Sequence, residues 1–160
     1  MKTKIFSRRF LVLRAGALVM GLALTLVSHT ARAELGGTVA SVHNDQVAMK
    51  ASIRITNAAS YTVHELAMPA GVIVREFVSG TGQVFGVAWA GPANPDLRQV
   101  LGTYFDQYQQ VRQQMRAPRG ALNVQLPGLI VQMAGHLRSF SGRAFVPEMI
   151  PQSVRAEEIR

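Results

Sequence analysis

The amino-acid sequence predicts an α+β fold: a mainly antiparallel sheet, built from a meander plus C-terminal strands, with one long amphipathic helix packed on one face. Three observations predict this fold. Three β-rich stretches follow one another, with three-residue loops ending in glycine between them. An apolar stripe then recurs at helical spacing after an Asn-Pro-Asp start. Apolar and polar residues alternate again near the C-terminus, which is typical of strands.

Residues 1–33 are predicted to be a cleavable export signal outside the fold. A basic stretch precedes an apolar run over 15–27, and Ala31 and Ala33 form a small-x-small cleavage site. The run is shorter than the roughly twenty residues of a spanning helix, so no stable membrane span is expected after cleavage. Arg8 and Arg9 lie in a twin-arginine-like motif, with the general export route as the alternative. We expect a periplasmic or secreted protein whose first partner is the export machinery.

The charge distribution argues against a nucleic-acid partner. The chain has 17 Lys and Arg against 9 Asp and Glu, but six of these cations and none of the acids lie in the predicted signal. The remainder carries a net charge of only about +2, too small for a protein that binds nucleic acid through its overall charge. The chain also has no cysteine, which excludes disulfides, thiolate zinc sites and a cysteine nucleophile.

Residues 34–160 have the length of one ordinary globular domain with a single core. A glycine-rich segment over 34–37, expected not to order by itself, precedes a short helix over 41–51 that is capped by Ser41. Residues 52–56 alternate weakly between apolar and polar side chains, and β-branched and aromatic residues then predict the three strands of the meander. These strands cover 61–67, 72–78 and 84–90, with hairpin loops at 69–71 and 80–82.

The two hairpin loops fix a register for the meander. The closing pairs Met68–Val72 and Ser79–Gln83 determine every opposite pair further along the strands, and therefore the residues that share a face. One predicted face carries Tyr61, Val63, Glu65, Ile73, Arg75, Phe77, Phe85, Val87 and Trp89. The other carries Thr62, His64, Leu66, Val74, Glu76, Val78, Val84, Gly86 and Ala88.

The aromatic face is expected to be core and to receive the long helix. Its two charged residues, Glu65 and Arg75, fall opposite each other in this register, where they can pair. On the second face His64 falls opposite Glu76. Such cross-strand pairs contribute about 0.2–1 kcal/mol and are ordinary sheet chemistry before they are catalytic chemistry.

The long helix is predicted to start at Asn94-Pro95-Asp96 and to end near Met115. A capping side chain, a proline in the first turn and an acid near the positive end of the dipole favour this start. Its apolar stripe runs from Leu97 to Val111. Further strands are predicted over 122–126, 129–133 and about 137–146, followed by an irregular tail from about residue 147.

Several segments together resemble the bacterial family known as domain of unknown function 2844. The resemblance covers nearly all of the chain after the signal and implies an exported bacterial protein, but it implies no activity, ligand or catalytic residue. The segments are Tyr61-Thr62-Val63-His64-Glu65, Pro69-Ala70-Gly71, Val74-Arg75-Glu76, Val84-Phe85-Gly86-Val87-Ala88-Trp89, Gly91-Pro92, Pro95-Asp96-Leu97-Arg98, Gly135-His136-Leu137-Arg138, Phe140-Ser141-Gly142-Arg143-Ala144 and Pro147.

The candidate ligand-binding residues are polar side chains that interrupt apolar strands. They are His64, Glu76, His136, Arg138 and Arg143. His136 and Arg138 are expected on one side of the last strand and Arg143 on the other. Either arginine could grip a carboxylate or phosphate of an envelope polymer. Alternatively, both pair with acids of the sheet or the helix start, which are Glu65, Glu76 and Asp96.

No catalytic residue, metal site or cofactor is predicted. Metal ligation would need several of the widely spaced His43, Asp45, His64, Glu76 and His136 to converge, and no pair of histidines lies one helical turn apart. The sequence has no glycine-x-serine-x-glycine elbow, and its glycines are spaced as turns, not as a phosphate loop.

Two functional classes remain open. The first is a noncatalytic binding or accessory module of the cell envelope, which holds an envelope polymer or another protein and needs no acid, base and nucleophile to converge. The second is a small metal-dependent or hydrolytic periplasmic enzyme that uses His64, Glu76 and His136. The first is preferred because no such catalytic set is visible in the sequence.

Overall fold

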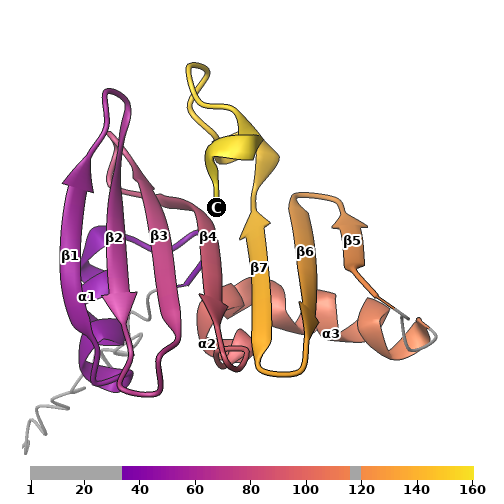
Figure 1. Cartoon of the computed structure of the whole chain (residues 1–160). Coiled ribbons are helices and arrows are strands. Elements are labelled where there is room, and N and C mark those ends of the chain that lie inside the picture. The colour runs from indigo at the N-terminus through magenta and orange to yellow at the C-terminus, as the bar shows by residue number, and fades with distance from the viewer. Residues whose placement is uncertain (1–33, 116–119) are drawn as a thin grey trace, which may run out of the picture.

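A computed structural model describes residues 34–115 and 120–160, so the predicted signal, with Arg8, Arg9, Ala31 and Ala33, lies outside the described residues. Seven strands form one sheet in which every neighbouring pair is antiparallel, in the order β1-β2-β3-β4-β7-β6-β5 (Figure 1). No helix within these residues is long and apolar enough to cross a membrane. The predicted α+β class with a mainly antiparallel sheet is therefore confirmed.

The elements follow the predicted order closely. The strands are β1 (Ser52–Asn57), β2 (Tyr61–Ala67), β3 (Ile73–Ser79), β4 (Val84–Gly91), β5 (Leu122–Leu126), β6 (Leu129–His136) and β7 (Ser139–Phe145). The α-helices are α1 (Val39–Ala48), α2 (Leu97–Leu101) and α3 (Phe105–Gln114), and the 3-10 turns are η1 (Gly102–Tyr104), η2 (Pro147–Met149) and η3 (Ala156–Glu158).

The two hairpin loops of the meander form as predicted. The backbone N–H of Met68 donates to the carbonyl of Val72 at 2.9 Å, and the N–H of Ser79 donates to Gln83 at 2.9 Å. Gly71 and Gly82, the last residues of the loops, both have φ of 80°, a conformation that glycine adopts without a Cβ penalty. Local turn chemistry therefore determined both closing pairs.

The register of the meander is confirmed between β2 and β3 but not between β3 and β4. Val78 pairs with Val84 as the loop requires, but Phe77 then pairs with Gly86, because a β-bulge gives β4 one extra residue. An extra residue reverses the alternation of every later side chain. Val87 and Trp89 consequently lie on the opposite face from the one predicted.

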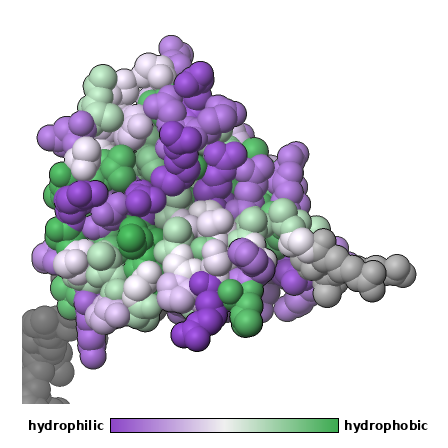
Figure 2. All heavy atoms as spheres, viewed as in Figure 1, coloured by the Kyte–Doolittle hydropathy of each residue, from purple (hydrophilic) through white to green (hydrophobic). Residues whose placement is uncertain are grey.

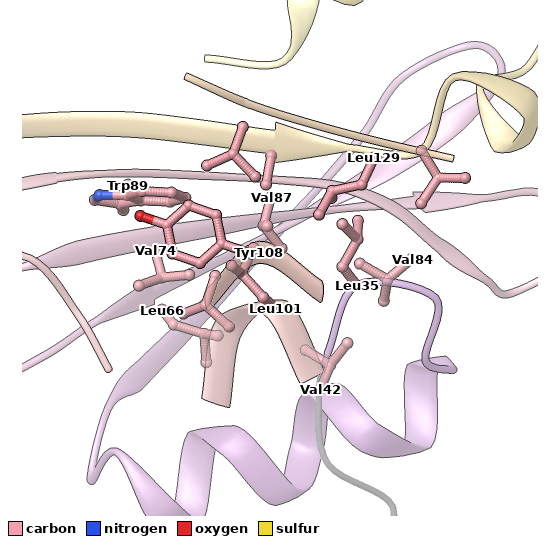
Figure 3. Close-up of a cluster of buried hydrophobic side chains, with 14 of the residues drawn as sticks. Leu35, Val42, Leu66, Val74, Val84, Val87, Trp89, Leu101, Tyr108 and Leu129 are labelled. Atoms are coloured by element: carbon pink, nitrogen blue, oxygen red, sulfur yellow. The ribbon is translucent and has the colours of Figure 1, made fainter. Parts of the chain in front are cut away.

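This reversal also changes which face meets the helices. The helices lie on one face of the sheet (Figure 1). Leu101 of α2 and Tyr108 of α3 share a buried cluster with strand residues of that face, which include Val74, Val87 and Trp89 (Figure 3). A second cluster lies on the other face of the sheet. In it, Val154 and Ile159 of the C-terminal segment, residues 147–160, pack against aromatic side chains. These are Phe77, Phe85 and Phe145, with the partly buried Tyr61 beside them. The expectation that the long helix covers the aromatic face was therefore wrong.

The long helix occupies the predicted range but is interrupted. The 3-10 turn η1 separates α2 from α3, and its first residue, Gly102, has φ of 54°. The cap is Asp96, whose side chain accepts from the N–H of Arg98 at 2.9 Å. Asn94 instead accepts from the indole Nε1 of Trp89 at 3.1 Å. The end near Met115 is as predicted.

The N-terminal segment differs from its prediction in two ways. The N-cap residue of α1 is Thr38, whose side chain makes no capping hydrogen bond, and Ser41 is a buried helical residue whose hydroxyl donates to the carbonyl of Thr38. The glycine-rich segment before it is ordered by the start of β4. The N–H of Gly36 donates to Val84 at 2.8 Å, and Leu35 is fully buried in the core. Tertiary contacts order a segment that has little local preference.

The C-terminal strands extend the sheet in a non-sequential order. Strand β7 inserts between β4 and β6, which leaves β5 at the edge. Residues 137–138 form the turn between β6 and β7, with Arg138 at φ of 63°, so the last strand begins at Ser139 and not at Leu137. His136 ends β6. The prediction that His136 and Arg138 share one side of a strand was therefore wrong.

Candidate functional site

The sheet separates the five predicted site residues into three places. His64 and Glu76 are buried on the face that carries the helices. His136 and Arg138 are exposed at the β6–β7 turn. Arg143 lies on β7, on the opposite face. Only His64 and Glu76, which pair across β2 and β3 as predicted, are brought together.

Glu76 is a buried acid with an unusual environment. Its side chain is 2% exposed, and its Oε2 has no hydrogen-bond partner in the described part of the chain. Burial, and secondarily the Asp45 carboxylate, raise its pKa to about 8. The carboxyl is therefore protonated at neutral pH. Asp45 comes from α1, is 2% exposed, and accepts from Nε2 of Gln99 at 2.8 Å.

His64 is held in its neutral form. Burial lowers the pKa of its imidazole, and Nε2 lies 3.2 Å from Oγ1 of Thr62. Its Nδ1 has no partner among residues 34–115 and 120–160. A neutral histidine beside a protonated glutamate under the helices is a buried polar pair of the core. It has no access to a solvent-borne substrate.

The three residues of the predicted enzyme do not converge. His136 on β6 is three strand spacings of about 4.8 Å, at least roughly 14 Å, from Glu76 on β3, and four spacings, at least roughly 19 Å, from His64 on β2. The residues that the structure describes also contain no group of three or more His, Cys, Asp or Glu placed to hold a metal ion.

A groove of about 440 Å³ lies on the face away from the helices, a volume typical of ligand sites. Its floor is a row of short side chains on three neighbouring strands, where Ala90 pairs with Ser141 and Ser141 pairs with Ala134. Short side chains leave a hollow above the sheet. Figure 2 shows this face, with strongly hydrophilic residues at the C-terminal segment and paler ones over the lower sheet.

A polar row borders this floor. Arg143 pairs across the sheet with Gln132, and Gln132 pairs with Asn123, so their side chains share the groove face. Nε of Arg143 donates to Oε1 of Gln132 at 2.7 Å. On the β3 side, Nε of Arg75 donates to Oε2 of Glu65 at 2.8 Å, which confirms that predicted pair.

The C-terminal segment supplies the remaining wall. Nη1 of Arg143 donates to the carbonyl of Ala156 at 2.8 Å, and Ile159 is fully buried against the sheet. These contacts place the exposed side chains of Glu157 and Arg160 at the groove. The groove therefore presents three arginines, Arg75, Arg143 and Arg160, and the single acid Glu157.

Of the groove residues, the sequence singled out only Arg143 as a site candidate. Ala90, Ala134 and Ser141 carry no chemical signal of their own. They form a continuous floor only because β7 lies between β4 and β6, an order that no local pattern contained. The contribution of Arg160 depended on the docking of the C-terminal segment, which was predicted to be irregular.

Comparison with known proteins places the chain in a family. A family model described as "Protein of unknown function (DUF2844)" matches residues 31–159. Searches of curated proteins and of solved structures found no match. Because the family model covers most of the chain, this protein belongs to the DUF2844 family of proteins of unknown function.

Proposed function

We propose that this protein is a noncatalytic binding module of the bacterial cell envelope, and that the groove on the sheet face is its ligand site. The observation that carries this proposal is the groove itself, a hollow with a floor of small residues, an excess of arginine and a bordering row of amide side chains. Arginine forks and side-chain amides recognise polar ligands without performing chemistry on them.

The charge balance of the groove supports a ligand with negative charge. Three arginines and one glutamate line the groove, and because Arg75 is already paired with Glu65, the local excess is about one positive charge. Arg143 is fixed in position by its bonds to Gln132 and to the C-terminal segment. A positioned guanidinium loses little conformational entropy when it binds an anionic group.

The alternative, a metal-dependent or hydrolytic enzyme, has no observation in its favour. His136 lies far from the His64–Glu76 pair, and that pair is buried under the helices. The envelope location rests on the predicted signal at residues 1–33, which would direct the chain to the export machinery by the twin-arginine or the general route.

The proposal is tested by filling the groove. Ser141→Trp places a large side chain on the floor at an exposed position. The matched control is Gln125→Trp, at an exposed position of β5 that does not line the groove. We expect the wild type and the control to sediment with the envelope fraction of the expressing bacterium, and the Ser141 variant to stay in the supernatant. Equal sedimentation of all three proteins would contradict the groove as the binding site, and a wild type that never sediments would contradict the module.

A further inference from the structure

We infer that the ligand of the groove is an acidic polysaccharide, a hydroxyl-rich chain that carries carboxylates, and that Arg160 and Arg75 contact those carboxylates. This inference rests on the proposed function, because it names the ligand class of the same groove. Three properties of the lining carry it: the state of its arginines, its uncommitted hydrogen-bonding groups, and its shape.

Arg160 is the guanidinium that is free to bind. Its side chain is exposed at the groove and has no hydrogen-bond or ion-pair partner within the described ranges. Arg75 is bonded through Nε to Glu65, which orients its fork, and its side chain is 35% exposed. The groove contains no lysine. Planar guanidinium forks match the planar two-oxygen geometry of a carboxylate.

Neutral polar groups provide the second part of the argument. The hydroxyl of Ser141 and the amide of Asn123 line the groove, and neither has a partner among the residues that the structure covers. Gln132 accepts from Arg143 through Oε1, which leaves its NH₂ group to donate. Hydroxyl and amide groups both donate and accept, as sugar hydroxyls do. These groups suit the hydroxyls of a sugar chain.

The shape of the groove favours an extended ligand. Its lining runs from Arg75 on β3 to Asn123 on β5, across four strand spacings, which is roughly 19 Å. The floor is made of alanine and serine side chains. Three large apolar residues, Trp89, Leu122 and Met133, also line the groove, and Trp89 and Leu122 are largely buried on the helix face of the sheet. An extended chain that lies along the sheet fits this track.

The test is a calorimetric titration of the purified protein with oligogalacturonate, a carboxylate-bearing sugar chain. The same oligomer with its carboxylates methyl-esterified is the ligand control. Arg160→Gln removes the free guanidinium. Arg54→Gln is the control, because Arg54 is an exposed arginine that pairs with Glu65, as Arg75 does, but does not line the groove. We expect Arg160→Gln to weaken binding about tenfold or more, Arg54→Gln to leave it unchanged, and the methyl ester not to bind.

Three results would overturn the inference. The first is equal binding of oligogalacturonate and its methyl ester by the wild type. The second is an unchanged affinity for oligogalacturonate in both the Arg160→Gln and the Arg75→Gln variants. The third is tighter binding of linear polyphosphate than of oligogalacturonate. Other results separate an error in the ligand class from an error in the proposed function. If the wild type sediments with the envelope but does not bind oligogalacturonate, the ligand class is wrong and the binding module stands. If Ser141→Trp sediments like the wild type, the groove itself is wrong.

Discussion

Replacing Glu76 by glutamine tests the buried acid under the helices. Glutamine has nearly the same shape but cannot ionise. In the folded protein the pKa of Glu76 is about 8, against 4.5 for an ordinary glutamate. As pH rises from about 4.5, the carboxyl ionises in the unfolded chain but stays protonated in the folded one. The free energy of unfolding therefore falls with rising pH and levels off above about pH 8.

The size of this effect follows from the pKa difference. Each pKa unit corresponds to about 1.4 kcal/mol, so Glu76 lowers the free energy of unfolding by roughly 3–4 kcal/mol between pH 5 and pH 8. This is a large part of a typical stability of about 5–15 kcal/mol. We expect Glu76→Gln to be roughly 4 kcal/mol more stable than the wild type at pH 8, and only about 1 kcal/mol more stable at pH 5.

The assay is urea unfolding of both proteins at several pH values from 5 to 8. The difference between them isolates Glu76, because other groups titrate in both. His64 is one such group: its lowered pKa makes stability rise with pH up to about 6.5, which opposes Glu76 in the wild-type curve. Glu148→Gln makes the same substitution at an exposed site and is the control. A difference between Glu76→Gln and the wild type that does not change with pH would refute the reasoning.

Three further predictions test the fold and the export route. Gly142→Ala should lower the free energy of unfolding, measured in urea, by about 2 kcal/mol or more, because the new Cβ would overlap the buried indole ring of Trp89. Gly80→Ala is the control and should have little effect, because nothing lies within 4 Å of its added Cβ. Arg143→Met should speed hydrogen exchange of the backbone amides in the C-terminal segment, because it removes the hydrogen bonds from Arg143 to the carbonyls of Ala156 and Ile159. Unchanged exchange would contradict the role of Arg143 in holding this segment on the sheet. Replacing Arg8 and Arg9 together by lysine should block export if the twin-arginine route is used, and unaltered secretion would leave the general route.

The meander was predictable because its determinants are local. Loops that end in Gly71 and Gly82 set the closing hydrogen bonds, and the pairing of β2 with β3 followed from the first loop without further information. The bulge in β4 had no such local determinant. One extra residue moved Trp89 to the helix face and left the aromatic face to the C-terminal segment. The helix was placed correctly along the chain, but on the wrong face of the sheet.

The candidate site also has one part that was predictable from local sequence and another that depended on contacts between distant segments. Arg143 could be singled out as a cation in an apolar strand, but its contacts with Gln132 and Ala156 connect segments that are distant in sequence. Arg160 carried no signal until the C-terminal segment was seen docked beside the groove. His64 and Glu76 were paired correctly, yet their burial under α1 turned a candidate site into part of the core.

The sequence by itself determined the fold class, the two hairpins and the range of the long helix. It also predicts an exported protein, and it excludes cysteine chemistry. These depend on turn residues, periodicity and composition, which act over a few neighbouring positions. The tertiary structure alone decided the bulge, the insertion of β7 between β4 and β6, and the docking of the C-terminal segment. Each depends on how well distant segments bury their apolar faces together, and the groove exists only where all three meet.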